Sequence, residues 1–193
     1  NVLEAAKALG VGHFVLLSAI CVQKPKLAFQ HAKLAFERAL AESGVDYSIV
    51  RPTAFFKSLA GQVDGVLRRG KPYVMFGDGE GTACKPISES DLARFMVECL
   101  DDPSRRNAIL PVGGPGDAVT PKQMGALLFA AVDRAPRYRR VPVALFDGIV
   151  GVLSLLSWVL PSLRDKAEFA RIGRYYATES MLVWDEDAGA YDA

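Results

Sequence analysis

The sequence predicts an α/β fold built on a doubly wound parallel sheet, and two observations indicate it. Helix-like and strand-like segments alternate over residues 1–52 in the order helix, strand, helix, strand, and the links between them are short. The first strand-like segment, His13–Ala19, is a nearly continuous apolar run, as expected of a strand buried on both faces of a parallel sheet. Together these features form the βαβ pattern of doubly wound sheets.

The first four elements each carry a local signal. The two helix-like segments have apolar residues at helical spacing, and each stops at a glycine, a common residue after a helix C-terminus. The second strand-like segment ends in a proline, which cannot donate to a sheet. The elements are expected over residues 1–9, His13–Ala19, Lys26–Ser43 and Asp46–Pro52.

Two later helices have capping signals. Ser88 precedes an acidic first turn, whereas Thr120 is followed by a proline and then by Gln123, the glutamine of a capping box. The other segments are read from periodicity and turn residues. We expect a helix over Phe55–Arg69, a turn-rich loop over Lys71–Gly81, a helix that starts at Ser88, a strand over Asn107–Val112 and a helix from Thr120 to about Val132.

The most apolar stretch of the chain is Val143–Leu160. Its uncharged core, residues 148–160, is too short to span a bilayer. We interpret the stretch as a buried helix. The alternative is an apolar helix that lies beside an apolar ligand or on a membrane surface.

Composition argues against several functional classes. Lys and Arg (23) almost balance Asp and Glu (22), and the net charge of +1 gives no reason to expect nucleic acid as a partner. Cys21, Cys84 and Cys99 are widely spaced, which fits a reducing compartment better than a disulfide framework. Because only two histidines accompany them, we expect no metal centre.

No glycine cluster matches a phosphate-binding loop. Gly10-x-Gly12 precedes a strand and lacks a third glycine, residues 77–81 are acidic, and residues 113–116 lack the lysine of a P-loop. The chain also begins in what reads as a helix already under way. We therefore expect an N-terminally truncated fragment, with the pyrophosphate-binding loop and any targeting peptide in the missing portion.

Lys33 lies at the edge of an apolar stripe on the helix Lys26–Ser43. On a helical projection Lys33 is roughly 40° from Phe29. Either its stem packs while its ammonium reaches solvent, or the ammonium points into a cleft at the carboxyl edge of the sheet, where ligands of such folds bind. The pattern leaves both readings open. The predicted stripe consists of Phe29, Ala32, Phe36, Ala39 and Leu40.

Two strand ends deliver polar groups to that same edge. Ser18 lies at the end of the first strand, and Arg51-Pro52-Thr53 ends the next. A serine there is commonly only a turn former. Two strand ends and a lysine that converge on one edge make a stronger case for a ligand site than any of them alone.

These residues carry a resemblance to a known superfamily. Ser18 after a strand, the helix motif Phe29-Gln-His-Ala-Lys33 and the strand end Arg51-Pro52-Thr53 resemble the atypical short-chain dehydrogenases, with Phe29 and Lys33 in the places of a Tyr-x-x-x-Lys motif. Further blocks over 13–25, 47–58 and 172–181 narrow the resemblance to its reductases of chlorophyll biosynthesis. The similarity covers essentially the whole chain.

The resemblance implies a fold and a domain division. The fold is the C-terminal portion of a Rossmann-like doubly wound parallel sheet with a small, mostly helical lobe. Residues 1–112 would form the later part of an NAD(P)-binding domain, and residues 113–193 the substrate-side lobe.

The implied activity is an NADPH-dependent reduction of a C=C bond, the 8-vinyl group of a divinyl chlorophyllide or protochlorophyllide, to ethyl. Lys33 would be the catalytic residue and a nicotinamide-ribose contact, with Ser18, Pro52 and Thr53 as further cofactor contacts. Phe29 departs from the superfamily pattern, because phenylalanine cannot donate the proton that tyrosine gives a carbonyl substrate. This departure fits an alkene better than a ketone.

The substrate side is less defined. A flat apolar macrocycle needs an aromatic cleft, for which Phe29, Phe55, Phe56 and the stretch 146–158 are candidates. The proton donor stays open between Lys33, water, Tyr175 and Tyr176. The cation for a propionate is sought among Lys57, Lys85 and Arg174.

Two other functions stay in view. The missing tyrosine allows a non-catalytic NAD(P)-binding sensor or assembly module, and a related reductase or isomerase of a small phenolic or sugar substrate is a third reading. The tetrapyrrole reading places the protein in a plastid, or else in the cytoplasm of a phototrophic bacterium, and leaves open a peripheral attachment to membranes. The oligomeric state is not predicted.

Overall fold

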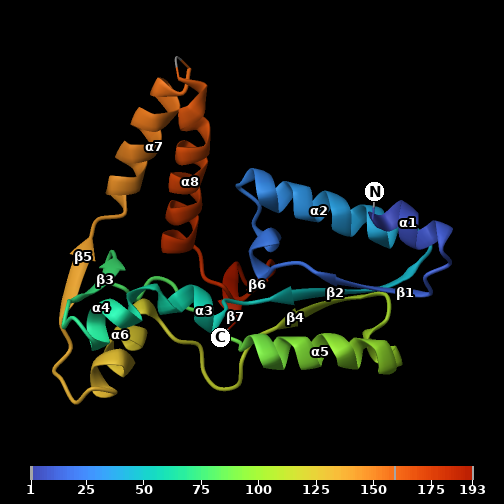
Figure 1. Ribbon diagram of the computed structural model, residues 1–193, viewed down its shortest axis with the longest axis horizontal. Helices are drawn as coiled ribbons and strands as arrows, with labels where there is room; N and C mark the ends of the chain where they lie inside the picture. Colours follow the sequence, from blue (N-terminus) through green and yellow to red (C-terminus); the bar gives the residue numbers. More distant parts are fainter. Residues whose placement is uncertain (1, 159, 193) are drawn as a thin grey trace. The chain divides into compact units, whose positions relative to one another are not determined.

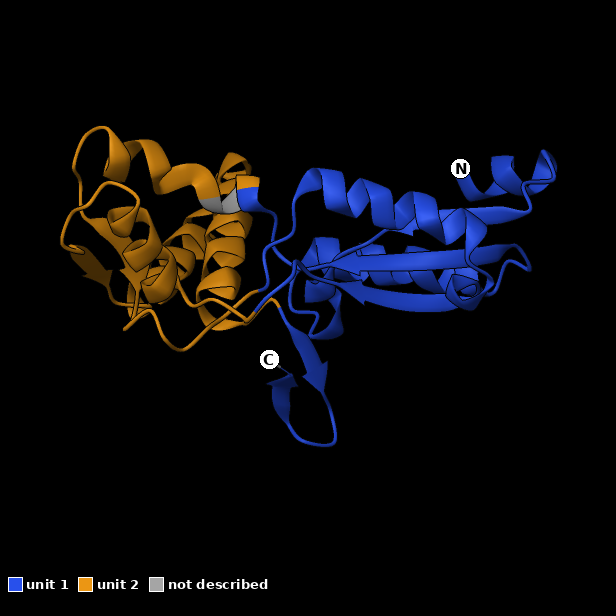
Figure 2. Cartoon of the chain, turned by 90° about the horizontal axis from the view of Figure 1, so that it is seen from below, with its two compact units in different colours: residues 1–56, 85–116, 182–193 blue, residues 57–84, 117–181 orange. Residues whose placement is uncertain are grey.

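The computed structural model describes residues 2–158 and 160–192, which pack as two compact units. The first unit contains residues 1–56, 85–116 and 182–193, and the second contains residues 57–84 and 117–181 (Figure 2). The chain thus changes units at residues 56, 84, 116 and 181, whereas the sequence suggested one boundary after residue 112. The cofactor-side and substrate-side roles of the predicted halves stay predictions.

The first unit is built on a three-stranded parallel sheet. Its strands are β1 (His13–Leu17), β2 (Asp46–Pro52) and β4 (Ala108–Val112), in the order β1-β2-β4. Helices α1 (Val2–Ala8) and α2 (Ala28–Ala41) cover one face, and α5 (Glu89–Asp101) covers the other (Figure 1). The predicted doubly wound parallel architecture is therefore confirmed.

The sheet alternates its side chains between two cores. Ile49 packs with Leu3 and Leu40 on the side of α1 and α2, whereas its neighbour Val50 packs with Leu92 on the side of α5. Successive residues of a strand point to opposite faces, so a central strand between two helical layers is apolar on both. This explains why the adjacent residues Ile49 and Val50 of β2 are both buried.

Both predicted caps are present. The Ser88 hydroxyl accepts a hydrogen bond from the Asp91 amide at 3.0 Å at the start of α5. At the start of α6 (Pro121–Ala130), Thr120 Oγ1 accepts from the Gln123 amide at 3.2 Å, and the Gln123 side chain accepts from the Thr120 amide at 2.8 Å. These bonds satisfy amides that have no partner inside the helix.

The second unit corrects two predictions. The expected loop over residues 71–81 contains β3 (Tyr73–Phe76), which pairs in parallel with β5 (Tyr138–Val141). The expected helix over residues 55–69 is broken by a 3₁₀ turn, at whose end the Gln62 side chain accepts from the Val74 amide at 2.6 Å and donates to the Val74 carbonyl at 2.7 Å. The pieces are α3 (Phe56–Leu59), a 3₁₀ turn η2 (Ala60–Gln62) and α4 (Val63–Leu67).

The apolar stretch 143–160 is helical but not buried. Helix α7 (Ala144–Leu156) has no buried residue, and beyond it Trp158 is 90% exposed. The buried-helix interpretation is wrong, because the helix packs mainly against α8 (Arg164–Thr178), which follows the turn η4 (Pro161–Leu163), and leaves the rest of its surface exposed. None of the helices in residues 2–158 and 160–192 has the length and apolar character needed to cross a bilayer.

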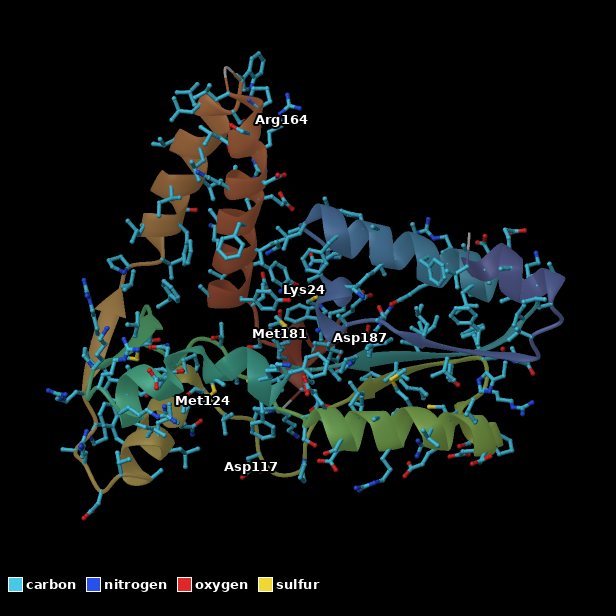
Figure 3. The ribbon with its side chains drawn as sticks, in the orientation of Figure 1. Lys24, Asp117, Met124, Arg164, Met181 and Asp187 are labelled. Carbon is cyan, nitrogen blue, oxygen red and sulfur yellow. The ribbon has the colours of Figure 1, made fainter. Side chains whose placement is uncertain are left out.

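The end of the chain returns to the first unit as a hairpin. Strands β6 (Val183–Asp185) and β7 (Ala190–Asp192) pair antiparallel. Gln23, in the turn η1 (Ile20–Gln23), donates to the Leu182 carbonyl at 2.5 Å and accepts from the Trp184 amide at 2.9 Å. Lys24, labelled in Figure 3, lies with Nζ 4.0 Å from the centroid of the Trp184 ring. A further 3₁₀ turn, η3 (Pro103–Arg105), precedes β4.

Candidate functional site

The carboxyl ends of the three parallel strands meet at one edge. The Ser18 amide donates to the Val50 carbonyl at 2.7 Å, and the Thr53 amide donates to the Val112 carbonyl at 2.9 Å. The hydrogen-bond ladder therefore continues one residue past each strand end and carries both hydroxyl side chains to this edge. In open α/β sheets this is the edge where ligands bind.

Lys33 and Ser18 line one pocket at this edge. The pocket has a volume of about 380 Å³ and is lined by Leu16, Leu17, Ser18, Ala32, Lys33 and Phe36. Lys33 Nζ lies 3.5 Å from the Leu17 carbonyl oxygen, the long limit of a hydrogen bond. The ammonium has two further donors, so it can bind a ligand hydroxyl without losing this contact.

A buried ion pair that the sequence did not reveal supports the pocket. Glu37 is 4% exposed and accepts from Arg51 Nη2 at 2.5 Å and from Arg51 Nε at 3.3 Å. The Ser18 hydroxyl donates to the same carboxylate. A buried carboxylate needs such partners, because its desolvation is otherwise costly. The Ser18 hydroxyl is thereby fixed with its proton directed toward Glu37, which leaves its oxygen as an acceptor toward a ligand's hydrogen.

The predicted stripe of α2 is confirmed only in part, because Leu40 is buried and Phe36 packs against the same core while the centre of the buried face is displaced toward Gln30 and Glu37. The buried residues of α2 are Gln30, Glu37 and Leu40, whereas the predicted Ala32 and Ala39 are exposed. Polar residues occupy the inner face because each finds partners there: Gln30 accepts from the amides of residues 26 and 27 and donates to the Cys21 carbonyl at 2.8 Å. The signal available in the sequence was the seven-residue spacing of Gln30 and Glu37, which places both on the face of Lys33.

Thr53 belongs to a second, tightly packed group at the same edge. Its hydroxyl donates to the Lys85 carbonyl, which also accepts from the Gly114 amide at 3.2 Å. A Cβ added at Gly114 would overlap the Pro86 carbonyl oxygen, so only glycine fits there. The glycine cluster 113–116 is thus a packed loop at a strand end, as the sequence suggested.

The predicted cofactor residues therefore form two groups. Lys33 and Ser18 share a pocket, while Pro52 is buried in β2 and Thr53 is held by Lys85. In the part of the chain that the structure describes, the link between the groups runs from Ser18 through Glu37 to Arg51, the residue before Pro52. Their roles toward a cofactor stay predictions.

The aromatic candidates differ in their surroundings. Phe29 is half-buried on α2, Phe55 packs against the core around Val50 and Leu92, and Phe56 is 58% exposed. Phe55 is thus part of the core of the first unit, so among the three its side chain has the least freedom to meet a ligand.

The two tyrosines proposed as proton donors lie in the second unit, as do the candidate cations Lys57 and Arg174. Tyr175 is 3% exposed and Tyr176 is 47% exposed, with their ring centroids 5.8 Å apart. Arg174 Nε pairs with Asp147 at 2.5 Å, so a propionate would have to compete with that carboxylate.

Comparison with known proteins shows a match to one protein family and similarity to individual relatives. A model of the NAD(P)H-binding family matches residues 1–103. The "divinyl chlorophyllide a 8-vinyl-reductase, chloroplastic" of Oryza sativa subsp. indica is 56% identical over 99% of this chain and 48% of its own length. The "photosystem II assembly factor Ycf39" of Trieres chinensis is 23% identical over 88% of this chain and 52% of its own length.

Solved structures share the fold. The triphenylmethane reductase of Citrobacter sp., complexed with NADP(H), superposes with a TM-score of 0.70 at 13% identity over 100% of this chain and 66% of its own. This similarity, together with the parallel sheet, makes the fold Rossmann-like. The chain spans about half the length of the curated relatives it matches.

Proposed function

This chain belongs to the NAD(P)H-binding family, and we propose that the protein reduces the 8-vinyl group of divinyl chlorophyllide a or protochlorophyllide a to ethyl with NADPH. The observation that carries the reaction is the 56% identity over 99% of the chain to a reductase of that name from Oryza sativa subsp. indica. The chain spans 48% of that relative, so the activity is proposed for the whole protein.

The reaction is balanced by one hydride and one proton. When bound, the reduced nicotinamide supplies a hydride to the outer vinyl carbon, and the negative charge delocalises into the conjugated ring. A proton then adds to the inner carbon. The sum is NADPH, a proton and the vinyl group giving NADP⁺ and the ethyl group. The protein mainly orients the two reactants and excludes water.

The geometry around β1 fits the nicotinamide half of such a cofactor. The Lys33 ammonium lies above the carboxyl end of β1 and can donate to ribose hydroxyls, while Ser18, whose proton is held by Glu37, can accept from them. NADPH rather than NADH is proposed because the Citrobacter structure of similar fold is a complex with NADP(H).

Phe29 favours an alkene substrate. It lies four residues before Lys33 on α2, on the same side of the helix, where the resembling superfamily has its tyrosine. A phenyl ring has no proton to give, and reduction of a carbonyl would leave an alkoxide without its donor. Hydride addition to a conjugated vinyl group generates a charge that the macrocycle itself spreads.

The direct test uses the full-length protein with NADPH and divinyl chlorophyllide a, followed by chromatography of the pigments. We expect a monovinyl product in proportion to the NADPH consumed. NADPH binding without any monovinyl product would contradict the proposal. That result would favour the non-catalytic assembly role, for which the 23% identity to the assembly factor of Trieres chinensis is the supporting similarity.

We place the protein in a plastid, because the Oryza sativa subsp. indica relative is named chloroplastic. Fractionation of the source cells is the measurement. Recovery of the full-length protein outside plastids would contradict this location.

A further inference from the structure

An open apolar groove runs along the helical hairpin of the second unit. Helices α7 and α8 lie side by side (Figure 1), and the groove along them has a volume of about 580 Å³. This volume lies within the range of small-molecule sites, about 300–1,000 Å³. Its main lining residues are Phe76, Phe146, Leu153, Phe169, Gly173 and Tyr176.

The floor of the groove is shaped by a glycine. A Cβ added at Gly173 would lie 2.9 Å from the Phe146 ring, so that ring rests on bare backbone of α8. Phe76 from β3 also packs against Phe146, with ring centroids 4.7 Å apart. Two packed rings thus form a firm aromatic surface rather than a gap between loose side chains.

The walls of the groove are apolar and exposed. Phe169 is 77% exposed, Tyr176 47% and Ile149 40%, and each lies beside the floor on α7 or α8. The α8 residues 166, 169, 173 and 176 follow helical spacing, so they form one stripe along the groove. Exposed apolar surface of this kind marks an interaction site.

One cation stands at this groove. Lys166, in the first turn of α8, is the charged residue among the lining side chains. Within the described residues its ammonium has neither an ion pair nor a hydrogen bond, unlike the nearby Arg171, which pairs with Glu168 at 3.2 Å. The groove therefore offers aromatic faces and one unpaired positive charge.

We propose that this groove binds the tetrapyrrole, with the conjugated ring against Phe146 of the floor and Phe169 of the wall and the propionate paired with Lys166. The inference rests on the proposed function and assigns the substrate site to the second unit. A planar ring matches open aromatic walls, and a single carboxylate matches a single unpaired ammonium.

A lipid surface fits these observations less well. The groove is concave, whereas lipid-bound helices present a convex apolar face rimmed by an excess of basic residues. On the hairpin, where Arg164 is labelled in Figure 3, acidic residues nearly balance the basic ones, so there is no large basic excess. Its charged residues are Asp147 on α7 and Arg164, Asp165, Lys166, Glu168, Arg171 and Arg174 on α8.

The first test measures binding of a pigment that cannot be reduced at position 8. The full-length protein is titrated with monovinyl protochlorophyllide, followed by pigment fluorescence. Phe169→Asp puts a charge on the groove wall at a position 77% exposed, so the fold should tolerate it. We expect at least about tenfold weaker binding. Leu127→Asp, 62% exposed on α6 of the same unit, is the matched control and should bind as the wild type does.

The second test isolates the carboxylate. The free acid of the pigment should bind the wild type about threefold more tightly than its methyl ester, as expected of an exposed ion pair. Lys166→Gln should remove this preference, and Lys166→Arg should restore it. Arg164→Gln, two residues earlier and outside the groove lining, should leave the preference unchanged.

Several outcomes would overturn the inference. Wild-type pigment affinity in Phe169→Asp would exclude the groove as the site. Loss of vesicle binding or of a dimer in that variant, with pigment binding intact, would assign the groove to lipid or to a second copy. Turnover separates this inference from the proposed function: pigment binding without monovinyl product refutes the reaction alone, whereas turnover with an unchanged KM in Phe169→Asp refutes the groove alone.

Discussion

Replacing Lys33 by methionine separates a ligand-binding role from a packing role, because methionine keeps the apolar stem and removes the ammonium. Within the described residues the ammonium has one hydrogen bond, 3.5 Å from the Leu17 carbonyl oxygen. An exposed contact of this length contributes about 0.5 kcal/mol or less to the free energy of unfolding. For a chain of this size, that corresponds to a change in Tm of about 2 °C or less.

Turnover is expected to change far more than stability. In the proposed site the Lys33 ammonium holds the nicotinamide ribose, and a small displacement of a bound reactant can cost about 100-fold in rate. We therefore expect kcat/KM of Lys33→Met to fall by about two orders of magnitude. The KM for NADPH should rise, because the ribose contact is also a binding contact.

The measurement is monovinyl product formed by the full-length protein at several NADPH concentrations, with Tm recorded on the same samples. Arg38→Met is the matched control, because Arg38 lies on the same helix and is exposed to solvent. Wild-type activity of Lys33→Met would show that the Lys33 ammonium is only solvated and binds no cofactor. A fall in Tm of more than about 5 °C would instead indicate a packing role.

Three other perturbations test the packing around the site. Glu37→Gln removes the carboxylate that pairs with Arg51, whose side chain is 16% exposed. We expect the free energy of unfolding, measured with denaturant, to fall by about 2–3 kcal/mol, and to fall less in the double variant Glu37→Leu/Arg51→Leu. An equal fall in both variants would contradict the ion-pair reasoning. Gly114→Ala should yield little soluble protein, because its methyl group would overlap the Pro86 carbonyl; a normal Tm would refute the close approach. Burial raises the pKa of the Cys84 thiol from 9.0 to about 11. The contribution of the neutral thiol to stability is therefore complete below pH 9 and is lost as the pH rises from 9 to 11. The free energy of unfolding should fall over this range relative to that of Cys84→Ala, and parallel pH profiles of the two proteins would contradict the prediction.

Local features of the structure were predictable where a few neighbouring residues decide them. Ser88 and Thr120 cap helices as predicted, because each cap needs only residues within one turn of the chain. The strand Asp46–Pro52 has its predicted limits, because the preceding Gly44 and the terminal proline are both local signals. The resemblance to the reductases was likewise carried by residue order.

The orientation of α2 and the fate of α7 were not local questions. Gln30 is buried because its side chain donates to the Cys21 carbonyl, and Glu37 is buried because it pairs with the Arg51 guanidinium. Both partners lie outside α2. Helix α7 is as apolar as a core helix, yet it remains exposed along its groove. Apolar composition indicates that a surface needs a partner, but it does not say whether the partner is core, ligand or lipid.

By itself the sequence determined the parallel α/β architecture, the capped helices and the convergence of Ser18, Lys33 and the end of β2 on one edge of the sheet. These follow from periodicities and strand direction, which are properties of a segment and its neighbours. Only the tertiary structure decided that Glu37 holds Ser18, that Gly114 must lack a side chain, and that an aromatic groove lies on the hairpin. Each of these depends on contacts between residues distant in the chain, and no local pattern records such contacts.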